Sequence, residues 1–401
     1  MKKLYFILFI ICLTTFGLVG CSSGDKAKGS EKEETKAKSE KKEESFKDAK
    51  EYRKLNEYMA EHTGGKVKVL HEDGKTREHD LDQLKVKLES YEVVSLKDVG
   101  EEFARVFDSE IGGRLVVARF TIHNAGKKDI YFIPAFSLKN RQVDYSKRNE
   151  DMFLPTAKQI AAKFDRDNAY VVKAGETVTG YEAYPLTEEV FSESTAILDV
   201  PLAMKKKDDY KSIFGTQGKF HISLNEKGAK KLAHNSAFYE DRVIAEDMGD
   251  KKMLKEKKGI NEKAKLEDIE VTLNGYQFTK FRPNRETGKR FNEFKHGMVL
   301  LTAEFTIKNG GKRPVRYFNS TLHMNNKTQT ARNEIILDNN LSNEPFKSGE
   351  SRKMLQVYTL DEEMYEKILK EKEFEIEFGP LYYDGKGNIL GKDTVKFPLP
   401  K

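Results

Sequence analysis

The sequence predicts a mostly β protein with two tandem β-sandwich domains, short helical additions and a disordered tether in front of them. Two observations predict the sandwiches: a long block of residues recurs later in the chain, and each copy contains short apolar runs separated by turn residues. A third observation predicts the tether, because a stretch rich in Lys and Glu follows an apolar N-terminal run.

Residues 1–20 are predicted to be a secretory signal peptide. Lys2 and Lys3 precede an apolar run from Leu4 to Phe16, and small residues follow it. The run is shorter than the roughly 20 residues that cross a bilayer. The alternative is an N-terminal membrane anchor, which the small-residue junction and the prompt return to polar residues disfavour.

The tetrapeptide Leu18-Val19-Gly20-Cys21 resembles the lipobox of bacterial lipoproteins. The resemblance implies that the thiol of Cys21 receives a diacylglycerol and that the chain is cut just before it. A single acyl chain, such as one palmitate, binds membranes only marginally, and a second makes anchoring stable. We therefore expect Cys21 to be a lipidation site that holds the protein on the extracytoplasmic face of the cell membrane.

Cysteine usage and charge exclude several classes of protein. The chain has two cysteines, Cys12 inside the predicted signal and Cys21, so no thiol remains for a disulfide, a metal or a nucleophile. The formal net charge of +6 is too small to predict nucleic-acid binding. Weak attraction to an anionic wall or membrane surface stays open beside ordinary solvated charge.

The segments before the first sandwich are expected to be simple. Residues 21–50 have almost no large apolar side chains, which predicts a disordered Lys/Glu tether after the lipidated Cys. Residues 51–84 are expected to form a short helix and a hairpin. Tyr52, Leu55, Tyr58 and Met59 share one apolar helical face, and Asp73-Gly74 is typical of a hairpin turn.

An internal repeat is the clearest signal in the rest of the chain. The block from Val86 to Lys127 returns without a gap from Val271 to Lys312, including Phe-Thr-Ile followed by Asn and Gly-Lys. Lys173-Ala174-Gly175-Glu176-Thr177 later returns as Lys347-Ser348-Gly349-Glu350-Ser351 at a shorter spacing, so the first copy carries an insertion. The repeat predicts one sandwich over 85–225 and a second over 263–401.

Two segments of these regions are predicted to be helical. Pro155 to Phe164 lies in the insertion of the first copy, and 226–262 is a charged, Lys-rich stretch expected to form a helical linker.

The strand, Asn-x-Gly-Lys turn and later Lys-x-Gly-Glu bend resemble immunoglobulin-like domains of unknown function in Gram-positive lipoproteins. Those domains are distantly similar to immunoprotective antigens secreted by mycobacteria. Many members have Pro where this chain has Ala174 and Ser348. The resemblance implies an immunoglobulin-like fold and an extracytoplasmic location, and it implies no reaction.

The repeated polar residues have structural explanations beside functional ones. Asn124 and Asn309 are expected to cap turns, with ligand binding as the alternative. Glycine and glutamate of each Gly-Glu pair are expected to form the bend that enters a strand. Tyr91 and Tyr276 are expected to be core residues with the hydroxyl at the rim, and the alternative is a matched pair of binding aromatics.

Catalytic signals are weak, and we expect no enzyme, cofactor or metal site. The eight histidines form no His-x-His or His-Glu-x-x-His pair; they are His62, His71, His79, His123, His221, His234, His296 and His323. His71 and His79 flank the predicted hairpin, so a metal site there is an alternative. Asp384 to Asn388 resembles a calcium loop but lacks its later acidic positions, and a hairpin turn is the better prediction.

The expected function is a non-catalytic binding or interaction module at the cell envelope. Its partners would be the membrane, through the N-terminal lipid, and an envelope protein or anionic wall polymer. The basic clusters Lys205-Lys206-Lys207 and Lys251 to Lys258, placed on loops or a helix, have polyanion binding and solubilising charge as alternatives. A solute- or metal-capturing lipoprotein is the second hypothesis, and a wall hydrolase the third.

Overall fold

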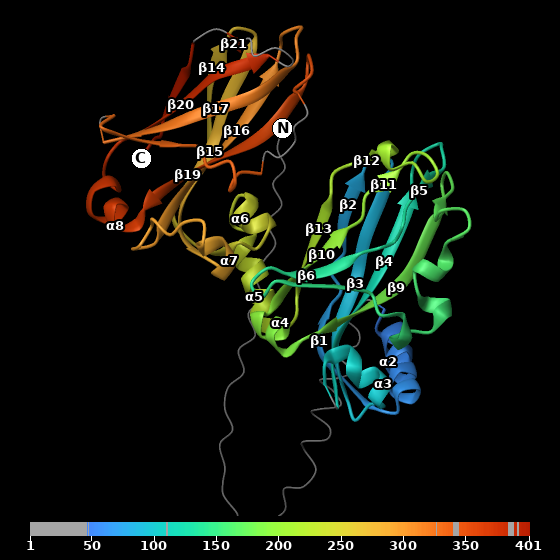
Figure 1. Cartoon of the computed structure of the whole chain (residues 1–401). Helices are drawn as coiled ribbons and strands as arrows, with labels where there is room; N and C mark the ends of the chain where they lie inside the picture. The colour runs from blue at the N-terminus through green and yellow to red at the C-terminus, as the bar shows by residue number, and fades with distance from the viewer. Residues whose placement is uncertain are drawn as a thin grey trace, which may run out of the picture. The chain divides into compact units, whose positions relative to one another are not determined.

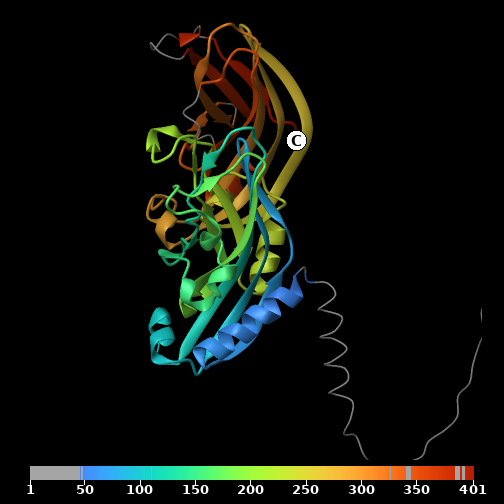
Figure 2. The ribbon, with the colours of Figure 1, turned by 90° about the vertical axis from the view of Figure 1, so that its right-hand side faces the viewer.

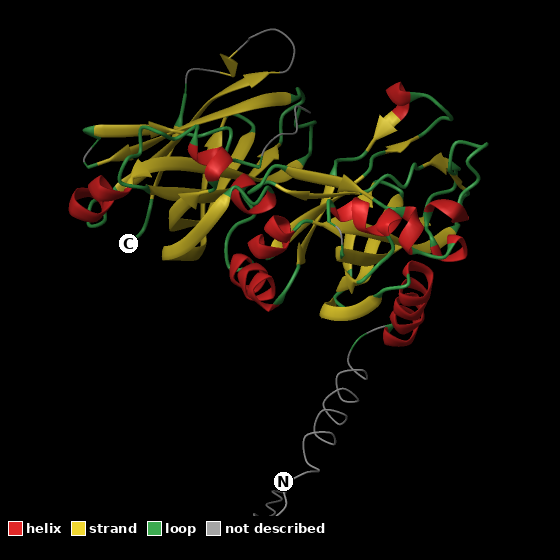
Figure 3. Cartoon of the chain, turned by 60° about the horizontal axis from the view of Figure 1, so that its bottom comes forward, coloured by secondary structure: helices red, strands yellow, loops and turns green. Residues whose placement is uncertain are grey.

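Strands dominate the structure, a computed structural model that describes residues 46, 48–109, 111–325, 327–339, 345–383, 389–390 and 393–401. Figure 1 shows the chain from blue to red, and Figure 3 shows how few residues are helical. The predicted signal peptide, Cys21 and nearly all of the predicted tether lie outside the described residues. The described part forms the two tandem β-sandwiches that the sequence predicts.

The first sandwich contains one continuous antiparallel sheet and a second layer in two parts. The continuous sheet has the order β1-β3-β4-β9, and β2 also pairs with β3. Its strands are β1 (Lys66–Asp73), β2 (Arg77–Leu81), β3 (Leu84–Lys97), β4 (Gly112–Asn124) and β9 (Thr177–Leu186). The other layer has the orders β13-β10-β6-β7 and β12-β11-β5-β8. Its strands are β5 (Ile130–Tyr131), β6 (Ser137–Asn140), β7 (Tyr145–Arg148), β8 (Val171–Val172), β10 (Thr195–Val200), β11 (Ala203–Met204), β12 (Ile213–Phe214) and β13 (Gly218–Ser223).

The second sandwich repeats this plan with longer strands. Its first sheet has the order β14-β15-β16-β19, with β14 (Gly249–Leu266), β15 (Ile269–Pro283), β16 (Met298–Asn309) and β19 (Ser351–Asp361). Its second sheet has the order β18-β17-β20-β21, and β22 also pairs with β20. These strands are β17 (Val315–Met324), β18 (Gln329–Arg332), β20 (Phe374–Tyr383), β21 (Ile389–Leu390) and β22 (Val395–Pro398).

Each sandwich has its own apolar core between the two sheets. In the first, the Phe120 and Phe136 rings stack with centroids 4.1 Å apart. In the second, Phe305 lies against Phe378 at 5.2 Å and Phe397 at 5.5 Å. All five rings are buried. Aromatic burial of this extent is a large stabilising term, and it supports a fold without disulfides.

The repeat in the sequence is a repeat in strand register. Leu88 pairs with Phe120 in the first sandwich, and Leu273 pairs with Phe305 in the second. Both strands carry a bulge directly after the leucine. The two copies therefore fold into the same sheet down to its irregularities, which confirms the predicted duplication.

A helix covers the outer face of the first sheet. Helix α2 (Ala49–Thr63) buries Tyr52, Leu55 and Met59, as the helical spacing predicts, whereas Tyr58 of the predicted face is only half-buried. The Tyr52 hydroxyl donates a 2.9 Å hydrogen bond to the carbonyl oxygen of Ser90 in β3. Figure 2 shows α2 lying along the sheet. Shorter helices lie in connections: α3 (Glu101–Ala104), α4 (Glu188–Glu193), α5 (Glu226–Asn235), α6 (Arg242–Ala245), α7 (Arg285–Gly288) and α8 (Glu362–Met364), which continues into a π-helical turn (Tyr365–Leu369).

The hairpin predicted at Asp73-Gly74 is wrong. Strands β1 and β2 both pair antiparallel with β3, so they run in the same direction as one interrupted edge strand. The hairpin lies instead between β2 and β3, where Asp82 has a positive φ of 57°. The Asp73 carboxylate accepts from the Lys75 amide, so its turn chemistry bends the strand without reversing it. Consequently 51–84 is part of the first sandwich.

The helical linker predicted over 226–262 is also wrong in its second half. The segment is helical over α5 and α6, but the chain is strand β14 from Gly249 onward. Lys and Glu tolerate helices, yet pairing along almost the whole of β15 overrides that propensity. The second sandwich therefore begins at Gly249. The segment Pro155 to Phe164 forms 3-10 helical turns over Thr156–Lys158 and Ala161–Lys163 in place of one helix.

Candidate functional site

The two repeated tyrosines are structural. Tyr91 and Tyr276 are both 0 % exposed, which leaves no ring face for a ligand. The Tyr91 hydroxyl accepts a 2.8 Å hydrogen bond from the Ser223 amide, and the Tyr276 hydroxyl donates a 2.5 Å bond to the Pro400 carbonyl. Each hydroxyl thus joins the first sheet to the last strand segment of its own sandwich, as core tyrosines with a rim hydroxyl should.

The repeated asparagines cap turns. In each copy the side-chain amide donates to two carbonyl oxygens and the side-chain oxygen accepts from the glycine two residues later. Asn124 bonds Lys128 (2.9 Å), Val172 (3.0 Å) and Gly126 (3.0 Å); Asn309 bonds Arg313 (2.9 Å), Phe346 (2.9 Å) and Gly311 (3.0 Å). Both residues are 0 % exposed, so their side chains stabilise the turns and are not accessible to a ligand.

The Gly-Glu pairs form the expected bends. Gly175 and Gly349 both have a φ of +77°, a conformation that glycine adopts without a steric penalty. Glu176 and Glu350 fold back and accept hydrogen bonds from the Lys173 amide at 2.7 Å and the Lys347 amide at 2.8 Å.

The histidines do not assemble a metal site. His71 Nε2 lies 2.8 Å from Ser223 Oγ, whereas His79 Nε2 lies 2.8 Å from the carbonyl oxygen of Thr216. The two rings therefore contact different segments: His71 contacts strand β13, and His79 contacts the loop before it. Among the described residues, no group of three His, Cys, Asp or Glu side chains is arranged to hold a metal ion.

The His71–Ser223 pair has the composition of a base and a nucleophile, but its surroundings indicate a structural role. Ser223 is 1 % exposed, and its hydroxyl is also 2.9 Å from the Tyr91 hydroxyl. The carboxylate in the network, Asp73, pairs with Arg77 at 2.8 Å and accepts from Tyr91 at 3.1 Å. A nucleophile must be reached by its substrate, and a buried hydroxyl cannot be.

The basic cluster from Lys251 to Lys258 lies on strand β14, where loops or a helix were predicted. Lys251 is buried and pairs with Asp241 at 2.6 Å, with both side chains 0 % exposed. Thr302 donates a 2.9 Å hydrogen bond to the same Asp241 oxygen. This ion pair fastens the segment before β14 to the outer face of the first sheet of the second sandwich.

Two buried carboxyls distinguish the first sandwich from the second. Glu92 is 1 % exposed, and burial raises its pKa to about 8 against a hydrogen bond from Asn56. Glu182 is also 1 % exposed, and burial raises its pKa although Tyr184 donates to it. At the repeat-equivalent positions the second sandwich has Gln277 and Gln356.

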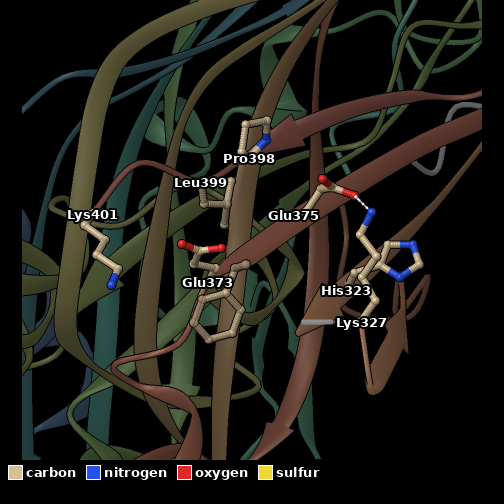
Figure 4. Close-up of a pocket in the computed structure, with 8 residues that line it drawn as sticks. His323, Lys327, Glu373, Glu375, Pro398, Leu399 and Lys401 are labelled. Carbon is tan, nitrogen blue, oxygen red and sulfur yellow. Dashed lines mark ion pairs between the residues drawn. The ribbon is translucent and has the colours of Figure 1, made fainter. Parts of the chain in front are cut away.

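An open cavity at one end of the second sandwich is the best candidate binding site in the described part of the chain. Its volume is about 580 Å³, within the range of small-ligand pockets. Three apolar side chains and five charged or titratable ones line it: Phe374, Pro398, Leu399, His323, Lys327, Glu373, Glu375 and Lys401. Figure 4 shows these side chains around the cavity.

The strand register explains why polar groups gather there. Glu375 pairs with His323 on one side and Pro398 on the other, so one row crosses β17, β20 and β22. Their neighbours Leu322, Ile376 and Phe397 belong to the core. Because successive residues of a strand point to opposite faces, the row of His323, Glu375 and Pro398 faces away from it.

Some of the charged side chains at the cavity already interact with other side chains of the protein. Lys327 Nζ lies 3.2 Å from Glu375, and His323 Nε2 lies 2.9 Å from Glu377. Partial burial alone would raise the pKa of Glu377, but hydrogen bonds from Thr394 and His323 lower it. Within the described residues, Nδ1 of His323 is buried without a hydrogen-bond partner, and exposed Glu373 has no ion-pair partner. Exposed Glu373 is therefore open to a ligand, whereas the buried Nδ1 atom of His323 is not.

Sequence reasoning found neither the cavity nor the buried carboxyls. The lining residues come from three short segments, and none of them carries a motif. A signal did exist for the carboxyls: the ungapped repeat aligns Glu92 with Gln277, and apolar residues flank both.

One family model matches the chain twice. The model for a domain of unknown function, DUF5068, matches residues 36–225 and 230–400. A search of curated proteins finds no match. In the described part, no helix is both long and apolar enough to span a bilayer.

Several solved structures are similar to parts of the chain. A protein from Listeria monocytogenes is 17 % identical with a TM-score of 0.34, over 42 % of this chain and 93 % of that one. A β-sandwich protein from Clostridium difficile is 13 % identical with a TM-score of 0.22, over 33 % and 99 %. The yjhA protein from Bacillus subtilis is 13 % identical with a TM-score of 0.23, over 38 % and 99 %. The Listeria and Clostridium proteins are described as functionally unknown and uncharacterised.

Proposed function

The chain belongs to the family of the domain of unknown function DUF5068, and from that premise we propose that it is a lipid-anchored binding protein of the cell envelope. It acts without catalysis on the extracytoplasmic face of the membrane. Cys21 carries the lipid, and the sandwiches, related distantly to immunoprotective mycobacterial antigens, present the binding surface. The cavity of the second sandwich is the observation that carries the binding part of the proposal.

The N-terminal residues support the anchor. Lys2 and Lys3, the apolar run and Leu18-Val19-Gly20-Cys21 have the order of a lipoprotein signal. Replacing Cys21 with Ala should abolish metabolic labelling with palmitate and release the protein into the medium. Continued labelling of the variant would refute the anchor and leave the cavity proposal untouched.

The lining of the cavity supports a peptide segment as its ligand. Pro398 and the edges of the largely buried Phe374 and Leu399 give the lining an apolar part, while Glu373 offers a carboxylate to an ammonium or guanidinium group. A peptide with a basic and an apolar side chain satisfies both requirements together.

Site-specific crosslinking on intact cells tests the cavity. A photoreactive residue at Lys401, an exposed lysine that lines the cavity, should yield a discrete protein adduct, and Glu373→Lys should remove it. The matched control is a photoreactive residue at exposed Lys312, in the turn before β17, because His323 lies at the far end of that strand. The same adduct from both positions would refute a specific site.

The second hypothesis, solute capture, is favoured by the volume of the same open cavity. It predicts an adduct at Lys401 that adds only the mass of a small molecule, measured by intact-protein mass spectrometry. A protein-sized adduct would instead support the interaction module.

A further inference from the structure

A small basic hairpin at one end of the first sandwich combines lysines with exposed apolar side chains. We define the basic hairpin as residues 202–214, with strands β11 and β12 and the loop between them. Ala203 pairs with Phe214, and Met204 pairs with Ile213. In Figure 1 these strands lie with β5 at the end of the sandwich away from α2 and α3.

Hydrogen bonds within the loop give the basic hairpin a fixed shape. The Ser212 amide donates to the Asp209 carbonyl at 2.8 Å, and the Lys205 amide donates to the Ser212 carbonyl at 3.1 Å. The Asp209 carboxylate accepts from the Lys211 amide at 3.0 Å. A loop that is already ordered loses less entropy when it binds.

Three apolar side chains on the basic hairpin face solvent. Tyr210 is 71 % exposed, Ile213 is 42 % exposed and Leu202 is 36 % exposed. Among the eight most exposed large apolar residues of the described chain, no other three lie so close in sequence. Neighbouring exposed apolar residues of this kind mark a surface that contacts another phase or another molecule.

Lysines surround these apolar residues. Lys205, Lys206, Lys207 and Lys211 are all exposed. Lys207 Nζ donates to the Asp167 carbonyl at 3.1 Å, and Lys205 Nζ lies 5.2 Å from the centre of the Phe214 ring. The loop also carries two acidic residues, Asp208 and Asp209, and the second is held by the loop bonds.

We propose that the basic hairpin docks on an anionic membrane surface and supplies a second contact beside the lipid. The inference rests on the proposed membrane anchor. Lysines attract anionic headgroups, and Tyr, Ile and Leu can enter the interface between headgroups and acyl chains. A dissolved anionic polymer would use the lysines but leave the three apolar side chains without a function. This difference favours a membrane.

Because the lipid anchor already holds the protein at the membrane, even weak binding by the basic hairpin would suffice for docking. Fewer than thirty residues separate Cys21 from Asp48, and an extended chain of that length reaches at most roughly 90 Å. A site tethered at such a distance experiences a high effective concentration of membrane. Docking would hold the first sandwich at the lipid surface.

The second sandwich provides an internal comparison. Its hairpin between β20 and β21 has the same pairing, Leu381 with Leu390 and Tyr382 with Ile389. Between these strands the sequence reads Asp384-Gly385-Lys386-Gly387-Asn388, with one lysine, whereas four lysines and Tyr210 lie between β11 and β12. The lysine-rich sequence between the paired strands is therefore a property of the first copy alone, whereas Ile213 has a counterpart in Ile389.

Vesicle co-sedimentation tests the docking without the lipid. The chain from residue 21, made with Cys21→Ser, should bind vesicles of equal parts phosphatidylglycerol and phosphatidylcholine and should not bind pure phosphatidylcholine. Lys206→Gln with Lys211→Gln should weaken binding about fivefold for each lysine lost. Tyr210→Ser with Ile213→Ser should weaken it about tenfold or more.

Matched variants keep the test specific. Ile335→Ser, at a residue 51 % exposed in the second sandwich, and Lys312→Gln should bind like the parent. Equal binding to both vesicle types, or no binding to either, would overturn the docking; palmitate labelling of Cys21 reports separately on the anchor. Binding that is unchanged by Tyr210→Ser with Ile213→Ser and is competed by soluble poly(glycerol phosphate) would assign the basic hairpin to a polymer instead.

Discussion

Glu92 and Gln277 occupy the same position in the two sandwiches. Glu92 pairs across the strand with Val117, and Gln277 pairs with Thr302, which is the repeat equivalent of Val117. Both side chains are buried, at 1 % and 0 % exposure, on the outer face of the sheet beneath a covering segment. A titratable group in one copy thus stands where the other copy has an uncharged amide.

The surroundings of the two groups differ accordingly. The Gln277 amide donates to the Ala237 carbonyl at 2.9 Å and to the Glu256 carboxylate at 2.5 Å. Glu92 faces Asn56 of α2 and lies opposite Glu72 of β1. In the described part, one buried Glu92 oxygen lacks a hydrogen-bond partner, and a proton there would remove the uncompensated charge of the buried carboxylate.

Glu92→Gln should remove a pH dependence of stability. Burial raises the pKa of Glu92 to about 8 from 4.5 in the unfolded chain, so the folded state binds the extra proton. Its stabilising contribution is present below pH 4.5 and is lost as the pH rises to about 8. Glu92→Gln should therefore be nearly neutral at pH 5 and stabilising by about 2–4 kcal/mol at pH 8.5.

Urea unfolding followed by tyrosine fluorescence and circular dichroism measures this difference, since the chain has no Trp. Exposed Glu102→Gln is the control and should leave the pH profile unchanged. Parallel pH profiles for the parent and Glu92→Gln would contradict the assignment.

The reciprocal change, Gln277→Glu, should destabilise the second sandwich. A carboxylate there cannot donate to the Ala237 carbonyl and would face Glu256, so two polar groups lose their donor. We expect a loss of about 2–4 kcal/mol at pH 8 and a smaller one at pH 5, where the new carboxyl is protonated more fully. Thermal unfolding at the two pH values measures the loss, and equal losses would contradict the argument.

Sequence patterns predicted the parts of the fold that local chemistry determines. The duplication placed both cores, and the Asn and Gly-Glu motifs placed their turns, because each copy must solve the same packing problem. Strand β14 escaped prediction because its Lys and Glu residues are compatible with helix, and only the partner strand β15 decides. The hairpin predicted at Asp73-Gly74 was wrong for a related reason, because the same dipeptide occurs both in hairpin turns and in bent edge strands.

The candidate site was harder to predict than the fold. His323 and Lys401 are far apart in the sequence, and only the register of β17, β20 and β22 brings their segments to one cavity. The sequence shows the basic cluster at Lys205, but the exposure of Tyr210 and Ile213 depends on the pairing of the hairpin. The exposure of a side chain and the convergence of distant segments on one cavity depend on tertiary structure, so a single sequence gives little information about them.

Asn124→Ala and Asn309→Ala should destabilise their sandwiches to a similar extent. Each removes three hydrogen bonds and leaves a buried carbonyl, of Val172 or Phe346, without that donor. The expected cost is about 2–4 kcal/mol in each case. Exposed Asn292→Ala is the control and should change stability by less than about 0.5 kcal/mol. A large difference between the two turn variants, measured by urea unfolding, would show that the turns are not equivalent.

Lys251→Met should destabilise the protein strongly by itself and less strongly when it is combined with Asp241→Asn. The single change leaves Asp241 buried with Thr302 and the Ile244 amide as donors but without its cation, and breaking such a pair costs about 3–5 kcal/mol. Adding Asp241→Asn removes the unpaired charge, and Asn can still cap α6 through its side-chain oxygen. The double variant should therefore be more stable than Lys251→Met by about 1–3 kcal/mol in urea unfolding. If the two substitutions lower the free energy of unfolding additively, the ion pair does not couple these residues. If the double variant recovers stability, charge compensation, and not Lys251 itself, holds this segment against the sheet.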